Sequence, residues 1–462
     1  MRYAVIADDL TGAGDTGAQF ARAGLRTRSL FGDWGAEDIE GADALVVNTD
    51  SRPLGPEEAY AAVRKAAGAL AEAGFLPVYK KIDSTLRGPA GRELDAVMDA
   101  SGADLAVLCP AFPANKRVVR GGILLVDGVP VAETALSRDP VTPVRESRIA
   151  AYIGGQSLRP VRELGRSVLD GGPEAVRSAL MDFRRAGGGI AVCDAEGEAD
   201  LALLARAALS LEPGVVLSGS AGLALPAAEI LAERAGRGRP AAAPAGSAGQ
   251  ASVLPNARPD ASSGAPRETR PRPVILAVGS VNPAARAQAE ALTAAGVREF
   301  RLDPGLILGA RSPVEADAEA EALGLRARDA LRMGGKVLIA TPGTRSDVEA
   351  AQSLGAGRGL SGAEVATVLA RALAGAVRAA IRDLPDPGVA ATGGDVARAL
   401  MSVLGARAVD LLGEVSPGIP LCAVRGGERP GLLLVTKAGG FGAPEALAKA
   451  VDLLSACPGA ES

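Results

Sequence analysis

Two adjacent carboxylates, Asp8 and Asp9, follow a short apolar run at residues 3–7. A glycine-rich turn and an alanine-rich stretch come next, a pattern typical of a buried strand, a loop and a helix. A carboxylate placed there can accept a proton or a hydrogen bond from a substrate hydroxyl. Asp is also a common helix cap, and strand geometry would turn the two side chains to opposite sides, so that only one would face a cleft. We favour a role in chemistry over one in capping.

A dense group of charged residues follows the next apolar runs along the chain. Its members are Arg52, Lys80, Lys81, Asp83 and Arg87. Lysine and arginine in such loops suit a carboxylate or a phosphate, and arginine can bind either one through two parallel hydrogen bonds. For each loop alone, ordinary solvated ion pairs are the alternative. Because ligands of parallel sheets bind beyond the carboxyl ends of the strands, we expect these loops and Asp8 and Asp9 to meet at one sheet edge.

A long polar segment, residues 110–147, follows another apolar run at 105–109. It begins with a proline-rich turn and continues through two adjacent glycines. Segments of this length with little regular structure are usually binding loops or lids. We therefore expect a binding loop or a lid here.

The second half of the chain has glycine-rich junctions in place of charged ones. Each junction follows an apolar run and two of them open a helical pattern, so that backbone N–H groups could face an anion. The candidate residues are Ser280, Gly393, Gly394, Asp395, Gly439 and Gly440. None of the junctions is a Walker A motif or a GxGxxG fingerprint, and glycine at such a turn is often only geometry. Together they favour a nucleotide-binding domain.

The elements that must position these residues are short apolar runs alternating with alanine-rich amphipathic stretches. This alternation predicts an α/β fold: two α/β domains with mainly parallel sheets and crossover helices. Residues 235–273 are rich in Pro, Ala, Gly, Ser and Arg and have few large apolar side chains. We predict a flexible linker there, between a domain at 1–234 and a domain at 274–462.

Composition excludes several classes of function. The chain has no histidine, which rules out Ser-His-Asp catalysis and histidine-based zinc chemistry. Its net charge of −4 and its 3% aromatic content argue against a nucleic-acid partner. Its four cysteines are widely spaced, which fits a reducing cytoplasm better than a disulfide framework. We see no signal peptide and no apolar run that would cross a membrane.

The motifs resemble those of the four-carbon acid sugar kinase family. The matching stretches are ADDLTGAGDTG, NTDSR, KKIDSTLRG, PAFPANKR, DGVPVAET, SRDPVTPVRES, GSVNP, TGGDVARAL, LLGEVSPGIPL and VTKAGGFG. The resemblance spans residue 4 to about residue 447 apart from the predicted linker. It implies an enzyme that phosphorylates the 4-hydroxyl of threonate, erythronate or a 3-oxo-tetronate with ATP and Mg²⁺. The N-terminal domain would bind the sugar acid and the C-terminal domain would bind ATP.

The resemblance also implies roles for single residues. The residues implied for the acid are Asp8, Asp9, Arg52, Lys81, Asp83 and Arg87. Those implied for the nucleotide are Ser280, Gly393, Gly394, Asp395, Gly439 and Gly440. We expect Asp9 to accept the hydroxyl proton, with Asp83 as its rival. A dinucleotide-dependent sugar-acid oxidoreductase and a non-catalytic sugar-acid sensor are the other candidates. We expect a cytoplasmic protein, and a homo-oligomer is compatible with the sequence.

Overall fold

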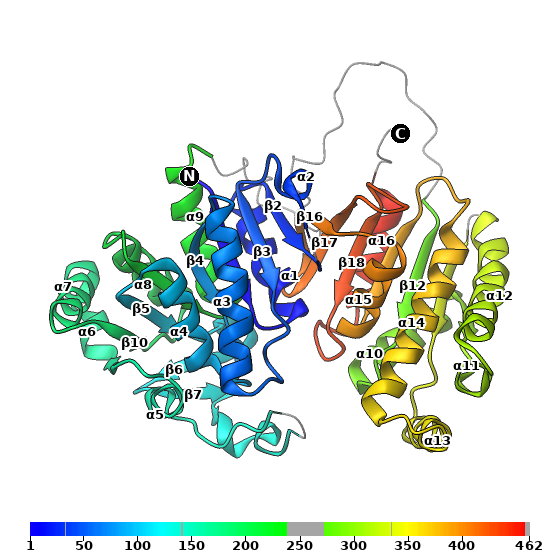
Figure 1. Ribbon diagram of the computed structural model, residues 1–462, viewed down its shortest axis with the longest axis horizontal. Coiled ribbons are helices and arrows are strands. Elements are labelled where there is room, and N and C mark those ends of the chain that lie inside the picture. The colour runs from blue at the N-terminus through cyan, green and yellow to red at the C-terminus, as the bar shows by residue number, and fades with distance from the viewer. Residues whose placement is uncertain (33, 140–141, 238–271, 334, 458–462) are drawn as a thin grey trace. The chain divides into compact units, whose positions relative to one another are not determined.

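The computed structural model describes residues 1–32, 34–139, 142–237, 272–333 and 335–457 (Figure 1). The chain divides into two compact units, which we describe one at a time. Unit 1 lies within Met1–Leu30 and Ile39–Ala242, and unit 2 within Phe31–Asp38 and Ala243–Ser462. The predicted linker at 235–273 lies outside the described residues, except for 235–237 and 272–273.

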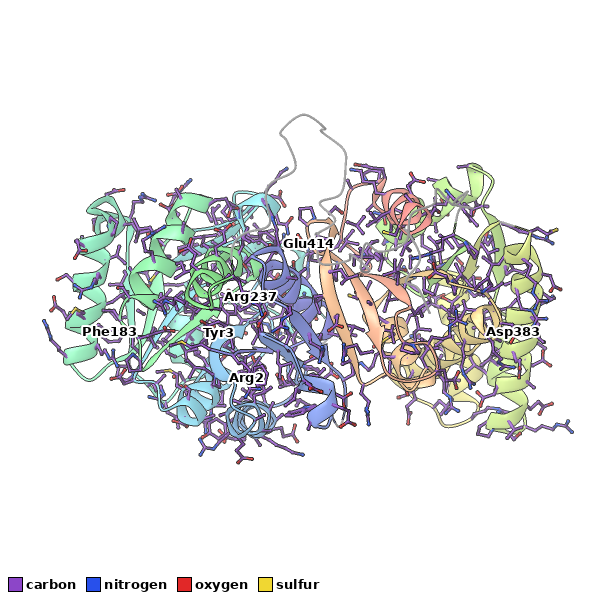
Figure 2. All side chains as sticks on the ribbon, turned by 90° about the horizontal axis from the view of Figure 1, so that it is seen from above. Arg2, Tyr3, Phe183, Arg237, Asp383 and Glu414 are labelled. Carbon is purple, nitrogen blue, oxygen red and sulfur yellow. The ribbon has the colours of Figure 1, made fainter. Side chains whose placement is uncertain are left out.

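Unit 1 is built on a parallel sheet with the strand order β2-β3-β1-β4-β11-β5-β10-β9. The strands are β1 (Tyr3–Ala7), β2 (Thr27–Leu30), β3 (Ala44–Asn48), β4 (Leu76–Lys81), β5 (Leu105–Cys109), β9 (Val161–Leu164), β10 (Gly189–Cys193) and β11 (Val215–Gly219). The central strands are apolar on both sides because helices cover both faces of the sheet, as in other parallel sheets. Tyr3 in β1, labelled in Figure 2, is buried and donates a hydrogen bond from its hydroxyl to the Leu231 carbonyl, 3.2 Å away.

Helices cover the two faces of this sheet in two groups. On one face α3 and α4 pack against each other, and Figure 1 shows them in front of the strands. The other group packs in the order α1, α9, α8 and α7. The helices of unit 1 are α1 (Leu10–Arg22), α3 (Pro56–Glu72), α4 (Ala90–Ser101), α5 (Ile149–Gly154), α6 (Arg166–Asp170), α7 (Gly172–Arg185), α8 (Glu198–Leu209) and α9 (Ala221–Arg234), and α2 (Ala36–Ile39) lies at the boundary between the units.

The segment 110–147 has more regular structure than its sequence led us to expect. It forms a three-stranded antiparallel sheet of β6 (Arg117–Arg120), β7 (Ile123–Val126) and β8 (Val129–Pro130), followed by short 3-10 turns. The turns between these strands are Gly121-Gly122 and Asp127-Gly128, and all four residues have positive φ. Two such residues make the turn that best matches the twist of a hairpin. The prediction of a loop with little structure was therefore wrong for its first half.

Unit 2 has a mixed sheet with the strand order β13-β14-β12-β15-β18-β17-β16. The first five strands are parallel, and β17 and β16 continue the sheet in antiparallel fashion. The strands are β12 (Val274–Val278), β13 (Arg298–Arg301), β14 (Lys336–Ala340), β15 (Gly388–Thr392), β16 (Ala408–Ser416), β17 (Ile419–Arg425) and β18 (Leu433–Lys437). The predicted class, α/β with mainly parallel sheets, is confirmed for both units.

Small residues let the helices of unit 2 pack closely. The helices are α10 (Pro283–Ala294), α11 (Pro304–Gly309), α12 (Pro313–Arg332), α13 (Arg345–Ala356), α14 (Gly362–Ile381), α15 (Gly394–Val403) and α16 (Ala446–Ala456). Gly324 of α12 faces the backbone of α14 so closely that a Cβ would collide with the Ala376 carbonyl. Alanine and glycine thus allow close packing in a chain that is only 3% aromatic.

A buried ion pair ties the central strand β4 to helix α4. The Lys80 ammonium lies 3.0 Å from Glu93 Oε2, and both side chains are almost completely shielded from solvent. Ser51, on the loop after β3, donates a hydrogen bond to the other carboxylate oxygen of Glu93. Removing one partner of such a pair leaves an uncompensated charge inside the protein, which typically costs about 3–5 kcal/mol.

We expect Glu93→Ala to lower the free energy of unfolding of unit 1 by about 3–5 kcal/mol in urea titrations. Glu57→Ala is the matched control, because Glu57 is 78% exposed although it too is paired with an arginine. The control should change stability by no more than about 0.5 kcal/mol. Equal effects of the two substitutions would show that the buried pair does not anchor β4 to α4.

Candidate functional site

Three neighbouring strands of unit 1 bring the predicted acid-site residues to one edge of its sheet. β1 ends before Asp8 and Asp9, β3 is followed by the loop that carries Arg52, and β4 ends at Lys81. The strands β3, β1 and β4 are adjacent and parallel, so their carboxyl ends lie side by side. This is the edge at which open α/β sheets bind ligands.

Arg52 lies between the carboxylates that follow β1. Its Nε and Nη2 donate to the two oxygens of Asp8 over 2.8 and 3.1 Å. Its Nη1 donates to Asp9 Oδ2 over 2.8 Å, and its Nη2 lies 2.7 Å from Asp9 Oδ1. The expectation that only one of the two aspartates would face the site is therefore wrong. β1 ends at Ala7, and beyond it both side chains turn to the same guanidinium.

Asp83 and Arg87 form a second ion pair on the loop after β4. Nε and Nη2 of Arg87 donate to the two oxygens of Asp83 over 2.7 and 3.2 Å, and Thr85 also donates to this carboxylate. The loop turns tightly, because Leu86 is buried with a φ of 63°, a left-handed conformation that costs a leucine about 1–3 kcal/mol. Asp83 Oδ1 lies 3.9 Å from Arg52 Nη2, so the two ion pairs form one cluster.

The cluster gives its three carboxylates different acidities. Burial opposes the ionisation of Asp8, but the charges of Arg52 and of Lys81 and Lys80, the last two residues of β4, outweigh it and hold the pKa below its usual value. Burial also opposes the ionisation of Asp83, and its two arginine partners lower its pKa far below the usual range. Burial raises the pKa of Asp9, and with the like charges of its neighbours it outweighs Arg52.

Asp9 is also the carboxylate that solvent reaches most easily. Its side chain is 26% exposed, compared with 2% for Asp8 and 10% for Asp83. Asp9 caps α1 as well, because its Oδ1 accepts a hydrogen bond from Gly12 N over 2.8 Å. Capping and chemistry, which the sequence offered as alternatives, therefore concern the same side chain.

Lys81 lies on the opposite face of β4 from Lys80. Its ammonium donates to the Ile82 carbonyl over 2.8 Å and lowers the pKa of Asp8. It lies so close to Gly12 that a Cβ there would be 2.7 Å from its Nζ and 2.5 Å from Asp9 Oδ1. A side chain at this position would therefore displace two charged groups of the cluster. All six predicted acid-site residues belong to one cluster.

Unit 2 has a pocket of about 400 Å³ beside the carboxyl ends of its parallel strands. Three of the predicted nucleotide residues, Ser280, Gly393 and Asp395, line it. The far end is apolar and is lined by side chains of α13 and α14, among them Val348, Ala351, Val365 and Leu369. A volume of this size falls in the ordinary range for small-molecule sites.

The glycine loops meet around Ser280. A Cβ at Gly439 would collide with the Ser280 hydroxyl, and a Cβ at Gly440 would lie 3.2 Å from the Asn282 side chain. A Cβ at Gly393, which has a φ of 99°, would lie 3.7 Å from Ser280 N. Gly439 and Gly440 are outside the lining of the pocket and adjoin it through these contacts, and Gly394 follows the lining residue Gly393. Five of the predicted nucleotide residues and Asp395 thus gather at one edge of the sheet.

Helix α15 begins at this edge without a side-chain cap. Gly393 occupies its N-cap position and the helix starts at Gly394. An uncapped helix start presents N–H groups and the positive end of the helix dipole, which favour an anion. By contrast, α10, which follows the neighbouring strand β12, is capped by Asn282, whose Oδ1 accepts a hydrogen bond from Ala284 N over 2.9 Å.

Two functional candidates in unit 2 were missed from the sequence. Lys437, at the end of β18, donates to the carbonyls of Ala438, Gly439 and Phe441 over 2.8–3.1 Å, and burial lowers its pKa to about 8. Arg286 of α10 donates to the carbonyl of Thr341, on the loop after β14, over 2.6 Å. Both cations shape a loop at the pocket edge. Lys437 precedes a glycine pair and could have been singled out, whereas nothing near Arg286 in the sequence marks its partner.

In the part of the chain that the structure describes, no group of three or more Cys, Asp or Glu side chains is arranged to hold a metal ion by itself. The same residues form no helix that is long and apolar enough to cross a membrane.

Comparison with known proteins places this architecture in a family. Residues 3–227 match the model of a sugar-binding N-terminal domain, and residues 275–447 match that of a nucleotide-binding C-terminal domain. A D-threonate kinase of Bordetella bronchiseptica is 36% identical over 97% of this chain and 96% of its own length. A 3-oxo-tetronate kinase of Pseudomonas fluorescens is 32% identical over 97% of this chain and 96% of its own. The chain belongs to the four-carbon acid sugar kinase family.

The fold is also similar to that of a solved structure. A crystal structure from Salmonella typhimurium LT2 superimposes with a TM-score of 0.75 and 24% identity, covering 97% of this chain and 98% of the other. This likeness concerns the fold alone.

The pKa directions in the cluster predict how the loss of Arg52 depends on pH. Asp8 and Asp83 have folded-state pKa values below the unfolded value, so their contribution to stability is present above about pH 4 and is lost at lower pH. Arg52→Met leaves Asp8 and Asp9 without their shared cation, so we expect their folded-state pKa values to rise above the unfolded value. We expect the variant to lose about 3–5 kcal/mol at pH 7 and less at pH 5, where protonation relieves the repulsion.

Urea unfolding at the two pH values measures this difference. Arg185→Met is the control, because Arg185 pairs with an aspartate of the same helix but is 70% exposed. Its effect should be within about 0.5 kcal/mol at both pH values. A loss for Arg52→Met that grew on acidification would contradict the electrostatic account of the cluster.

Proposed function

We propose that the chain is an ATP-dependent kinase that phosphorylates the 4-hydroxyl of a four-carbon sugar acid. The observation that carries the proposal is a division of chemistry between two sheet edges. One edge holds a cluster of carboxylates and cations with a single accessible carboxylate, and the other holds glycine loops beside a pocket. The names of the relatives, a D-threonate kinase and a 3-oxo-tetronate kinase, support this assignment.

In unit 1 the sugar acid binds at the cluster after β1, β3 and β4. Asp9 accepts the proton of the terminal hydroxyl, since it is the most exposed of the three carboxylates and its pKa is raised. Asp83 suits this task less well, because Arg87 binds both its oxygens and its pKa is strongly lowered. Arg52 and Lys81 keep Asp9 in position and balance the charge of the cluster. The substrate-binding set is Asp8, Asp9, Arg52, Lys81, Asp83 and Arg87.

In unit 2 the nucleotide binds with its base in the apolar end of the pocket and its phosphates at the glycine loops. The uncapped start of α15, at Gly393 and Gly394, and the hydroxyl of Ser280 supply donors for phosphate oxygens. Lys437 binds the carbonyls of the loop at Gly439 and Gly440, which holds this loop against Ser280. Phosphoryl transfer needs this positioning more than it needs covalent chemistry from the protein.

Mg²⁺ is the cation expected with ATP. No group of three or more Cys, Asp or Glu side chains in the described residues is arranged to hold a metal ion, so the ion would be held mainly by phosphate oxygens and water, as Mg²⁺ usually is. Asp395, exposed in the first turn of α15 and lining the pocket, is the carboxylate placed to add one ligand. The ion would neutralise phosphate charge.

In the proposed reaction a bond forms between the terminal hydroxyl oxygen and the γ-phosphorus. The bond between this phosphorus and the oxygen bridging to the β-phosphate breaks, and ADP leaves. The hydroxyl proton passes to Asp9. The products are ADP and a sugar acid phosphorylated at its 4-position.

A coupled ADP-release screen tests the function. The acids are D-threonate, L-threonate, D-erythronate, L-erythronate and the 3-oxo-tetronates, each with ATP and Mg²⁺. We expect ADP to form with at least one of them in equal amount to the phosphorylated acid. Ligand binding with no ADP would indicate a sensor. A change in nicotinamide absorbance with NAD and an acid would indicate an oxidoreductase.

The proton acceptor is tested by Asp9→Asn. Asparagine can still accept the hydrogen bond that caps α1, but it cannot take a proton. We expect kcat to fall about 10²- to 10⁴-fold, with a much smaller change in the KM for the sugar acid. The comparison variant is Asp83→Asn, which loosens Arg87 and should act mainly on that KM. If Asp9→Asn kept its kcat and Asp83→Asn lost it, Asp83 would be the base.

A further inference from the structure

A sugar acid brings a carboxylate, and the arginines closest to the proposed base are already engaged. Three nitrogens of Arg52 face the oxygens of Asp8 and Asp9. Arg87 uses Nε and Nη2 for both oxygens of Asp83. Nη1 of Arg87 also lies 3.9 Å from Asp139 Oδ2. The positive charges of both arginines are therefore already compensated by internal carboxylates. A cation that no internal carboxylate compensates would attract the substrate carboxylate more strongly.

The guanidinium of Arg117 has an N–H group without a hydrogen-bond partner among the described residues. Arg117 is the first residue of β6, and its backbone pairs in both directions with Phe112, on the loop after β5. Its Nη1 donates to the Asn115 carbonyl over 3.0 Å. Its Nε is buried and has no hydrogen-bond partner among the residues that the structure describes. Within the same residues Arg117 forms no ion pair.

Arg117 lies at the same sheet edge as the cluster. It pairs with Phe112 just after β5 ends at Cys109, and β11 alone separates β5 from β4, whose following loop carries Asp83 and Arg87. Burial lowers the pKa of the Arg117 guanidinium, while Asp83, Asp127 and Asp15 oppose this shift and Arg87 adds to it. A half-buried guanidinium with unfilled donors has lost water contacts without replacing them, so an arriving carboxylate can supply both the charge and the hydrogen bonds.

The ion pairs of the cluster also favour Arg117 as the cation that binds the substrate carboxylate. Asp8, Asp9 and Asp83 share Arg52 and Arg87, and Lys80 is paired with Glu93. Lys81 and Arg117 remain without an ion pair within 4 Å among the described residues. Lys81 is buried beside Asp9 and Gly12, where it serves the carboxylates of the cluster. Arg117, at the start of β6, has a planar guanidinium that can bind a carboxylate through two parallel hydrogen bonds.

We propose that Arg117 binds the carboxylate of the sugar acid and thereby selects acids over uncharged sugars. The inference rests on the proposed function, since it concerns the same site and substrate class. It adds a residue outside the loops after β1, β3 and β4. The hairpin β6–β7, with its two tight turns, holds this residue at the sheet edge.

The test compares an acid with its amide, which has the same carbon skeleton but no charge. Binding of D-threonate and of D-threonamide to the full chain is measured by calorimetry without ATP, and the measurement is repeated with whichever acid is active in the ADP screen. For Arg117→Met we expect affinity for the acid to fall about ten- to a hundredfold, with affinity for the amide changed less than about threefold. Arg117→Lys keeps the charge but loses the planar fork. Its affinity for the acid should therefore lie between those of the wild-type protein and of Arg117→Met. The KM for ATP should stay unchanged in both variants.

Arg120→Met is the matched control. Arg120 lies on the same strand but is 64% exposed and paired with Glu196. This variant should leave the acid-to-amide ratio unchanged. Thermal unfolding of every variant identifies misfolding, and Arg117→Lys keeps the test decisive if Arg117→Met does not fold.

Two outcomes would overturn the assignment. Equal losses for acid and amide would make Arg117 a structural residue of the hairpin. Unchanged affinity for both ligands in both Arg117 variants would assign the carboxylate to another cation. Failure of the proposed function would be seen separately. The wild-type protein would then bind the acid but release no ADP.

Discussion

One guanidinium, that of Arg52, holds together the charged cluster at the sheet edge of unit 1. Asp8, Asp9 and Asp83 come from two neighbouring loops and would repel one another if no cation lay between them. Arg52 bonds directly to the first two and lies 3.9 Å from the third. As a result two carboxylates are held ionised, and Asp9 keeps the raised pKa and the solvent access that a proton acceptor needs. The close approach of Gly12 and the buried pair Lys80–Glu93 hold the strands that carry these groups.

Much of the fold was predictable from sequence because parallel strands are buried on both faces and read as continuous apolar runs. The central strands β1, β5, β12 and β15 were all anticipated in this way. The strands that were missed are of other kinds. β2 and β13 contain charged or polar residues, and β16 alternates between buried and partly buried positions. The hairpin at β6–β8 could have been found, because Asp127-Gly128 is a strong hairpin signal that the length of the segment obscured.

The candidate sites were predictable for a related reason. Residues that directly follow parallel strands must share one edge of the sheet, so sequence position alone brought Asp8, Arg52 and Asp83 together. Position along the chain does not reveal which charges are satisfied. Arg52 and Arg87 donate to internal carboxylates, whereas Arg117 does not. This difference depends on packing between segments that are far apart in sequence. The three carbonyls around Lys437 likewise follow from the path of the folded loop.

The central claim is that the sugar acid and the nucleotide are bound by different units through different chemistry. Hydrogen–deuterium exchange of the full chain tests this most directly, with ATP and Mg²⁺ added alone and with the active sugar acid added alone. The account predicts that the acid slows exchange at residues 8–12, 52 and 81–88, and that the nucleotide slows it at residues 279–282, 393–397 and 438–442. Protection of the glycine loops by the acid, with no change at residues 8–12, would contradict the account.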